Sequence, residues 1–239
     1  MSSAPKTSAA ASSKMKKRRL RTAFFIMKVR GIMQYIVLAA FLVMVGCYLY
    51  YQQFKHKPGS GLKKRIAVKC SATLMAALVA LLGAIDSGLP AHWVVFAGIV
   101  ICAIADGVLC VHFMLGAGVF ALGHLVLIVG FSLMHLPGWG SLLTFICLMA
   151  LITYLCEKWK RRMGRRAPMF FGYGIMLCLM TAVSAAQSPL FFAGGLLFAI
   201  SDGLLGWQLF NRVNLRIDYF SLGCYYLAQF LMGLAIYLH

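Results

Sequence analysis

Two aspartates stand in apolar stretches of the sequence, where a carboxyl group can do acid or base chemistry if the fold shields it. Asp106 lies in AIADGVLC, residues 103–110, and Asp202 lies in AISDGLLG, residues 199–206. A charged side chain inside a membrane costs roughly 3 kcal/mol, and such residues usually face the protein interior and mark function. Each aspartate also has a structural interpretation, in which it caps a helix break at the next glycine or pairs with a buried cation.

The two motifs belong to a longer repeat. FAGIVICAIADGVLC, residues 96–110, and FAGGLLFAISDGLLG, residues 192–206, are identical at eight of fifteen positions with a constant offset of 96 residues. The repeat suggests two related four-helix halves. An even number of membrane spans separates the motifs, so both helices cross in the same direction and we expect both carboxyl groups at the same depth.

The composition indicates that membrane-spanning helices position these residues. Hydrophobic residues make up 62% of the 239 positions, the mean hydropathy is +0.85, and only 12% of the residues are charged. A water-soluble domain does not have this composition. Apolar runs near the roughly 20 residues that span a bilayer predict an all-α polytopic bundle of about eight transmembrane helices. The predicted spans are 32–51, 66–84, 92–109, 115–133, 139–156, 168–187, 189–209 and 217–238.

The basic residues gather at the flanks of these spans. Of 23 Lys and Arg, nine precede the first span, six lie within 55–69, six within 158–166, and two are Arg212 and Arg216. Lysine and arginine at such positions contact lipid head groups. Membrane lipids are therefore the expected partners, and no nucleic acid is expected, because no basic stripe interleaves with aromatic residues.

The expected organisation is a tail followed by one membrane domain. Residues 1–30 form a basic tail too polar to bury, which we expect to be disordered. Residues 31–239 form a single transmembrane domain of a multi-pass protein, for which a bacterial inner membrane and the endoplasmic reticulum are the favoured locations. The oligomeric state stays open. The eight cysteines form no CxxC pair, so neither a disulfide framework nor a metal site is predicted.

Other polar side chains in the spans can support the two carboxyl groups. His124 lies half way along its span, and Tyr225 and Gln229 are four residues apart on one helix face. Lys69, about one turn inside its span, can extend to the head groups, hold a phosphate or pair with an aspartate. A structural role is the alternative for His124, and an interfacial or packing role is expected for Tyr173. The set favours acid–base chemistry on a lipid without a cofactor.

The motifs resemble those of a known family. GIVICAIADGVLC followed by GVFALGHLVLIVGF, and GGLLFAISDGLLG followed by YYLAQFLMG, make the sequence similar to the YhhN family of lysoplasmalogenase-like integral membrane proteins. The resemblance covers most of the membrane region but not the first span or the tail. Ala105 replaces the glycine usual before the first aspartate, and Leu127 replaces a common aromatic residue, which affects only the fine shape of a pocket.

The resemblance implies an ether hydrolase that acts on alkenylglycerophosphoethanolamine or alkenylglycerophosphocholine, without a cofactor or metal. The products would be a fatty aldehyde and glycerophosphoethanolamine or glycerophosphocholine. Asp106 and Asp202 would be the acid and base in an undetermined order. His124 and either Tyr225 or Gln229 would orient water or the carboxylates. Lys69 would meet the substrate phosphate.

Two other classes of function remain compatible with the sequence. Paired intramembrane acids also occur in proton-coupled transporters of small molecules or lipids. A parallel repeat and the lack of a proline-broken helix near the acids argue against that class. The third class is a lipid-binding membrane protein without catalysis. Release of a fatty aldehyde separates the enzyme from both.

Overall fold

The computed structural model describes residues 31–55, 57, 59, 61–211 and 214–239. The chain divides into two compact units, Met1–Ala39 and Ala40–His239. Of the first unit, the structure describes residues 31–39, which are helical. The predicted tail of residues 1–30 lies outside the described residues.

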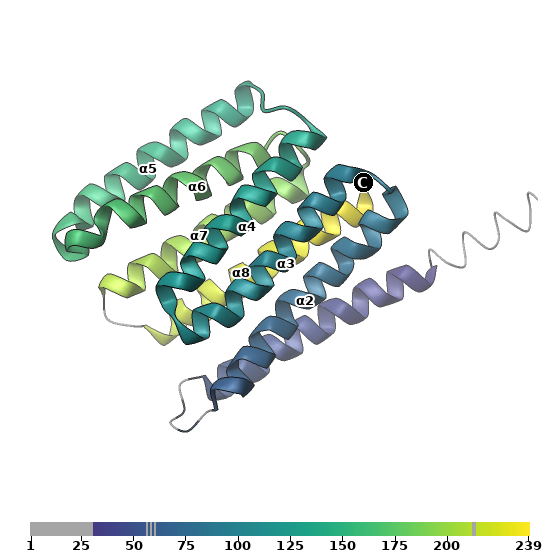
Figure 1. Ribbon diagram of the computed structural model, residues 1–239, viewed down its shortest axis with the longest axis horizontal. Helices are drawn as coiled ribbons and strands as arrows, with labels where there is room; N and C mark the ends of the chain where they lie inside the picture. The colour runs from purple at the N-terminus through teal and green to yellow at the C-terminus, as the bar shows by residue number, and fades with distance from the viewer. Residues whose placement is uncertain (1–30, 56, 58, 60, 212–213) are drawn as a thin grey trace, which may run out of the picture. The chain divides into compact units, whose positions relative to one another are not determined.

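The described residues form α-helices and one short 3-10 helix, without a strand, which confirms the predicted all-α polytopic bundle (Figure 1). Seven helical stretches among them are long and apolar enough to cross a membrane, one of which contains both α5 and α6. The chain is therefore an integral membrane protein. The elements are a first helix Gly31–Phe54, α2 Leu62–Ser87, α3 Pro90–Val111, α4 Phe113–Met134, α5 Trp139–Met163, η1 Gly164–Arg166, α6 Ala167–Ser184, α7 Pro189–Phe210 and α8 Leu215–Leu238.

Local sequence explains where several helices begin and turn. Pro90 and Pro189 occupy the first turns of α3 and α7. Proline has no backbone N–H, and at this position an N–H would have no partner within the helix. The side chains of Ser188 and Asn214 accept hydrogen bonds from backbone N–H groups at the starts of α7 and α8. Gly164 has a φ of 56°, a conformation that glycine adopts without steric cost, and the chain reverses there between α5 and α6 (Figure 1).

The sixth predicted span, 168–187, extends beyond the helix. Helix α6 ends at Ser184, and residues 185–187 form a turn whose N–H groups bond to carbonyls three and four residues earlier. Ala185 and Ala186 suit a helix as well as a turn. Hydropathy alone therefore does not mark this end.

Helix packing within the unit Ala40–His239 follows the same pattern in its two halves. Helix α3 packs on α4 as α7 packs on α8, and α2 contacts α3 and α8 as α6 contacts α7 and α4. The two helices that carry the repeated aspartates therefore have corresponding neighbours. This arrangement agrees with the repeat in the sequence.

Two glycines bring α2 and α8 into close contact. A Cβ atom at Gly83 would lie 2.6 Å from the backbone of Tyr237, and one at Gly233 would lie 2.6 Å from the carbonyl oxygen of Ala76. Small residues let membrane helices approach closely in this way. The close approach matters for the site, because both helices supply side chains to Asp106.

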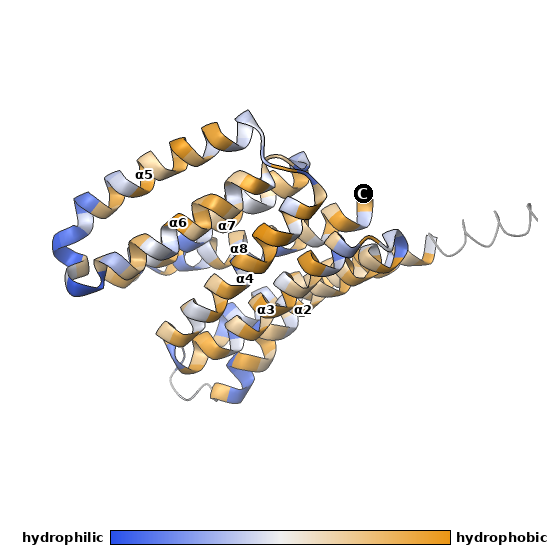
Figure 2. Cartoon of the chain, turned by 45° about the horizontal axis from the view of Figure 1, so that its top comes forward, coloured by the Kyte–Doolittle hydropathy of each residue, from blue (hydrophilic) through white to orange (hydrophobic). Residues whose placement is uncertain are grey.

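Hydrophilic residues concentrate at helix ends, most clearly at the turn between α5 and α6 (Figure 2). This turn carries Lys160, Arg161 and Arg162 in the last turn of α5 and two arginines in η1. Hydrophobic residues cover most of the helices between such ends (Figure 2). The distribution is the one expected for helices that cross a bilayer.

Candidate active site

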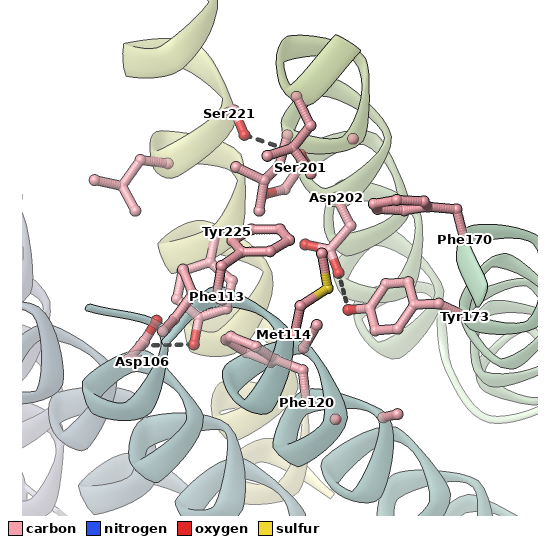
Figure 3. A pocket seen from close by; sticks show the side chains of 18 of the residues that line it. Asp106, Phe113, Met114, Phe120, Phe170, Tyr173, Ser201, Asp202, Ser221 and Tyr225 are labelled. Atoms are coloured by element: carbon pink, nitrogen blue, oxygen red, sulfur yellow. Dashed lines mark hydrogen bonds between the residues drawn. The ribbon is translucent and has the colours of Figure 1, made fainter. Parts of the chain in front are cut away.

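A cavity of about 480 Å³ opens among the helix ends near both repeated aspartates (Figure 3). Its wall combines the last turns of α3 and α7 with the first turns of α2, α4, α6 and α8, and with the end of the first helix. Most of the lining is apolar. The charged lining residues are Lys55, Arg65, Lys69, Asp106, Asp202 and Asp218.

Asp106 is fully buried and surrounded by donors. Its Oδ2 atom accepts a hydrogen bond from the hydroxyl of Tyr225 at 2.8 Å and another from the hydroxyl of Thr73. Its Oδ1 atom lies 3.0 Å from Nζ of Lys69. Lys69 and Thr73 are one helical turn apart on α2, so they present both groups from one face. A cation and two hydroxyl donors stabilise the ionised carboxylate.

Asp202 has different surroundings. Its side chain is half-buried, and its Oδ2 atom accepts a hydrogen bond from the hydroxyl of Tyr173 on α6 (Figure 3). No lysine or arginine in the described ranges lies within ion-pair distance of Asp202. Asp202 therefore faces the cavity with one hydroxyl donor, and no cation of the described residues pairs with it.

Aromatic rings form the floor of the cavity. The ring of Tyr225 lies 5.7 Å from that of Phe120 and 5.4 Å from that of Phe198, measured between centroids and with edge-to-face geometry. Such ring pairs are favourable packing arrangements. They separate the cavity from the part of the bundle behind them.

Two residues expected in the site do not line the cavity. His124 is fully buried, and its ring packs 4.7 Å from Phe198 and 5.7 Å from Tyr173 between centroids. Gln229, one turn beyond Tyr225 on α8, is fully buried beside the thiol of Cys102. Neither His124 nor Gln229 lines the cavity.

The structure thus groups four of the six residues proposed from the sequence. Asp106, Asp202, Tyr225 and Lys69 line one cavity. Lys69 pairs with Asp106, one of the three possibilities that the sequence left open. The roles of all six residues stay predictions, and for His124 the geometry adds no contact with the cavity.

Sequence reasoning missed two residues that hold the carboxyl groups, Thr73 and Tyr173. Thr73 follows Lys69 by four positions, so helical spacing from a suspected lysine could have identified it. Tyr173 is 29 residues from Asp202, and no local pattern connects them. The expectation that Tyr173 is an interfacial or packing aromatic did not anticipate its hydrogen bond.

The comparisons with known proteins agree with the motif pattern. The model of the YhhN family matches residues 64–236, which include most of α2 and all of α3 to α7. The chain belongs to the YhhN family. A comparison with curated proteins and another with solved structures give no match.

In this member of the YhhN family, the cavity offers acid–base chemistry next to an apolar wall. Asp106 has a cation and two hydroxyl donors as partners, whereas one carboxyl oxygen of Asp202 accepts a hydrogen bond from Tyr173. No group of three or more His, Cys, Asp and Glu side chains in the described part of the chain is arranged to hold a metal ion.

Proposed function

We propose that this protein hydrolyses the vinyl-ether bond of alkenyl lysophospholipids. The products are a fatty aldehyde and glycerophosphoethanolamine or glycerophosphocholine. One observation carries the proposal, namely that Asp106 and Asp202 line the same largely apolar cavity with different partners. The motifs of the YhhN family support the same reaction.

The reaction needs a proton donor and an anion. A proton adds to the β-carbon of the vinyl ether, and the electron pair of the double bond forms the new C–H bond. The adjacent carbon and the ether oxygen then share the positive charge of an oxocarbenium ion. Water adds to this carbon, loses a proton and gives a hemiacetal, which breaks its C–O bond to leave an aldehyde and a glycerol hydroxyl. Glycoside hydrolases stabilise a similar cation with two carboxyl groups.

The surroundings of the two aspartates support a division of these roles. Asp202 is the proposed proton donor, because it faces the cavity with a single hydroxyl donor from Tyr173. Once it has given up its proton, the same carboxylate can take a proton from the attacking water. Asp106 is the proposed anion that stabilises the cation, because Lys69 pairs with it and two hydroxyl groups donate hydrogen bonds to it.

The wall of the cavity supports an amphiphilic substrate with one chain. Leu109, Phe113, Met114 and Leu205 provide apolar surface near the aspartates, and Lys55 and Arg65 lie just after the first helix and in the first turn of α2. A hydrocarbon chain can pack against the first group while a polar head remains near the second. Water excluded by the chain would strengthen the electrostatic interactions of the carboxyl groups.

The supporting roles follow from the contacts. Tyr225 is proposed to orient Asp106, and Lys69 to serve as its counter-ion. Contact between Lys69 and the substrate phosphate, as expected from the sequence, would compete with this ion pair. His124 would act through its ring contacts with Phe198 and Tyr173, and Gln229 does not line the cavity.

Aldehyde release by the purified protein in detergent tests the proposal. The substrate is an alkenyl lysophosphoethanolamine, and its control is the saturated alkyl-ether lipid of equal chain length, which cannot be protonated at a double bond. We expect aldehyde from the alkenyl lipid alone, and we expect the Asp106→Asn and Asp202→Asn variants to lose this release. Full activity of either variant would refute its assignment, and the absence of aldehyde with folded wild-type protein would refute the reaction.

A further inference from the structure

Three cations line the cavity, and two of them have carboxylate partners. Lys55 pairs with Asp218, and Lys69 pairs with Asp106. The Lys55 ammonium also lies 5.7 Å and 5.4 Å from the ring centroids of Tyr51 and Tyr219. These contacts commit both lysines to groups of the protein.

Arg65 is the third cation, and its charge has no carboxylate partner among the described residues. It lines the cavity and is half-buried, and its Nε atom is buried without a hydrogen-bond partner in the described part of the chain. A guanidinium group presents several N–H donors in a planar array that matches phosphate oxygens. The guanidinium group also interacts with the hydroxyl of Tyr51, but no carboxylate among the described residues pairs with it, so its positive charge can take an anion in the cavity.

The position of Arg65 on its helix is also unusual. It lies in the first turn of α2 together with Lys63 and Lys64, and this turn contains no acidic residue. The N-terminus of a helix carries partial positive charge, so basic side chains there are unfavourable unless an anion is nearby. An anion bound by Arg65 would offset this repulsion.

The spacing along α2 relates Arg65 to the carboxyl groups. Arg65 precedes Lys69 by four residues, which corresponds to about 6 Å of helical rise on one face. Lys69 in turn contacts Asp106. In a lysophospholipid, a three-carbon glycerol unit separates the ether oxygen from the phosphate. A phosphate at Arg65 would therefore place the ether bond near the depth of the aspartates.

We infer that Arg65 binds the phosphate of the lysophospholipid head group and thereby selects substrates that carry a phosphodiester. The inference rests on the proposed function for the identity of the substrate. It transfers the phosphate contact from Lys69, where the sequence placed it, to Arg65. Lysophospholipids and the two-chain phospholipids of a membrane both carry a phosphodiester. The experiment must therefore distinguish binding of the substrate from binding of bilayer lipids.

Binding measurements on the full chain in a neutral detergent test the site without catalysis. The two probes are an alkyl-ether lysophosphoethanolamine, which cannot react by protonation of a double bond, and the alkyl glycerol with the same chain and no phosphate. We expect Arg65→Gln to weaken binding of the phosphate-containing probe by at least about tenfold, as for loss of a charge-assisted hydrogen bond. Binding of the alkyl glycerol should change by less than about twofold. Arg65→Lys should restore part of the difference.

Lys64→Gln is the matched control, because it removes the same charge from the same helical turn. Lys64 is exposed and lies over the rings of Tyr50 and Phe54, at 4.7 Å and 4.5 Å from their centroids, outside the cavity lining. We expect this variant to bind both probes as the wild type does. An equal loss in Lys64→Gln and Arg65→Gln would mean a general effect of surface charge and would overturn the inference.

Competition experiments distinguish the sources of phosphate. Neither inorganic phosphate nor two-chain phosphatidylethanolamine is expected to displace the lysolipid probe as effectively as unlabelled lysolipid. Equal displacement by the two-chain lipid would assign Arg65 to bilayer head groups, and equal displacement by inorganic phosphate would remove the selection for a lipid. Equal loss of both probes in Arg65→Gln would show a structural role. Retained probe discrimination without any aldehyde release would refute the reaction and leave the phosphate site intact.

Discussion

The surroundings of Asp106 and of Asp202 differ although the two residues stand at matching places of a repeat. Asp106 is fully buried between α2 and α8 with a cation and two hydroxyl donors, whereas Asp202 is half-buried with one hydroxyl donor from α6. Duplicated helices thus present the same carboxyl group, while neighbouring helices supply different partners to it. The difference makes one aspartate suited to stabilise positive charge and the other suited to transfer a proton.

The neighbouring helices produce this asymmetry. Helix α2 brings Lys69 and Thr73 to the first aspartate, and helix α6, in the corresponding place, brings Tyr173 to the second. Two related halves therefore do not require two equivalent sites. Variants of the aspartates and of their partners test whether the two residues have different roles.

The largest expected effect is that of Asp202→Asn on the rate. An asparagine cannot donate the proton or take it back, so we expect aldehyde release to fall about 10²- to 10⁴-fold. Thermal stability in detergent should change little, because Asp202 has no paired cation in the described part of the chain. Glu157→Gln is the control, since that acid is exposed and pairs with Lys160 on α5. A rate near that of the wild type would remove the distinction between the two aspartates.

Asp106→Asn should differ from Asp202→Asn by destabilising the fold. It leaves the ammonium of Lys69 buried without its partner, and loss of one member of a buried ion pair costs about 3–5 kcal/mol. Denaturant unfolding in detergent measures the change. We expect the double variant Asp106→Asn/Lys69→Met to recover much of the stability and none of the activity. An Asp106→Asn protein as stable as the wild type would contradict a buried ion pair at this place.

Replacement of Tyr173 should reduce the rate of aldehyde release more than replacement of Tyr225 does, and both effects should be smaller than that of Asp202→Asn. Tyr173→Phe removes the hydroxyl donor of Asp202, and a hydrogen bond to a charged group is worth about 1.5–3 kcal/mol, so we expect aldehyde release to fall about tenfold or more. Tyr225→Phe leaves Thr73 and Lys69 on Asp106 and should reduce the rate by less. The measurement is kcat and KM for both variants. A larger loss in Tyr225→Phe would reverse the proposed division of roles.

The smallest effect is expected at His124, which does not line the cavity. Neither nitrogen of its ring has a hydrogen-bond partner among the described residues, and replacement of an unpartnered polar group by an apolar one of similar size is nearly neutral. We therefore expect His124→Leu to change aldehyde release by less than about threefold, since no hydrogen bond is lost. A loss as large as that in Asp202→Asn would restore His124 as a residue of the site.

Much of the architecture could be predicted from the sequence, because membrane helices leave a local signal. Apolar runs of bilayer length predicted the helices, and the cost of an intramembrane carboxyl group singled out Asp106 and Asp202. The motifs around them also indicated the YhhN family, which the family model confirms. Each of these inferences depends on residues close together in the chain.

Local sequence patterns therefore specify the membrane helices and the two aspartates at corresponding places. The partners of the aspartates depend on how the helices pack, because Thr73, Tyr225 and Tyr173 reach the aspartates across 33, 119 and 29 residues. The same packing decides that Lys69 pairs with Asp106 and that His124 does not line the cavity. Hydropathy specifies which segments cross the membrane, whereas the packing of helix faces specifies which polar groups meet. This packing sets the environment of a buried carboxyl group, and the environment decides which of its protonation states is favoured.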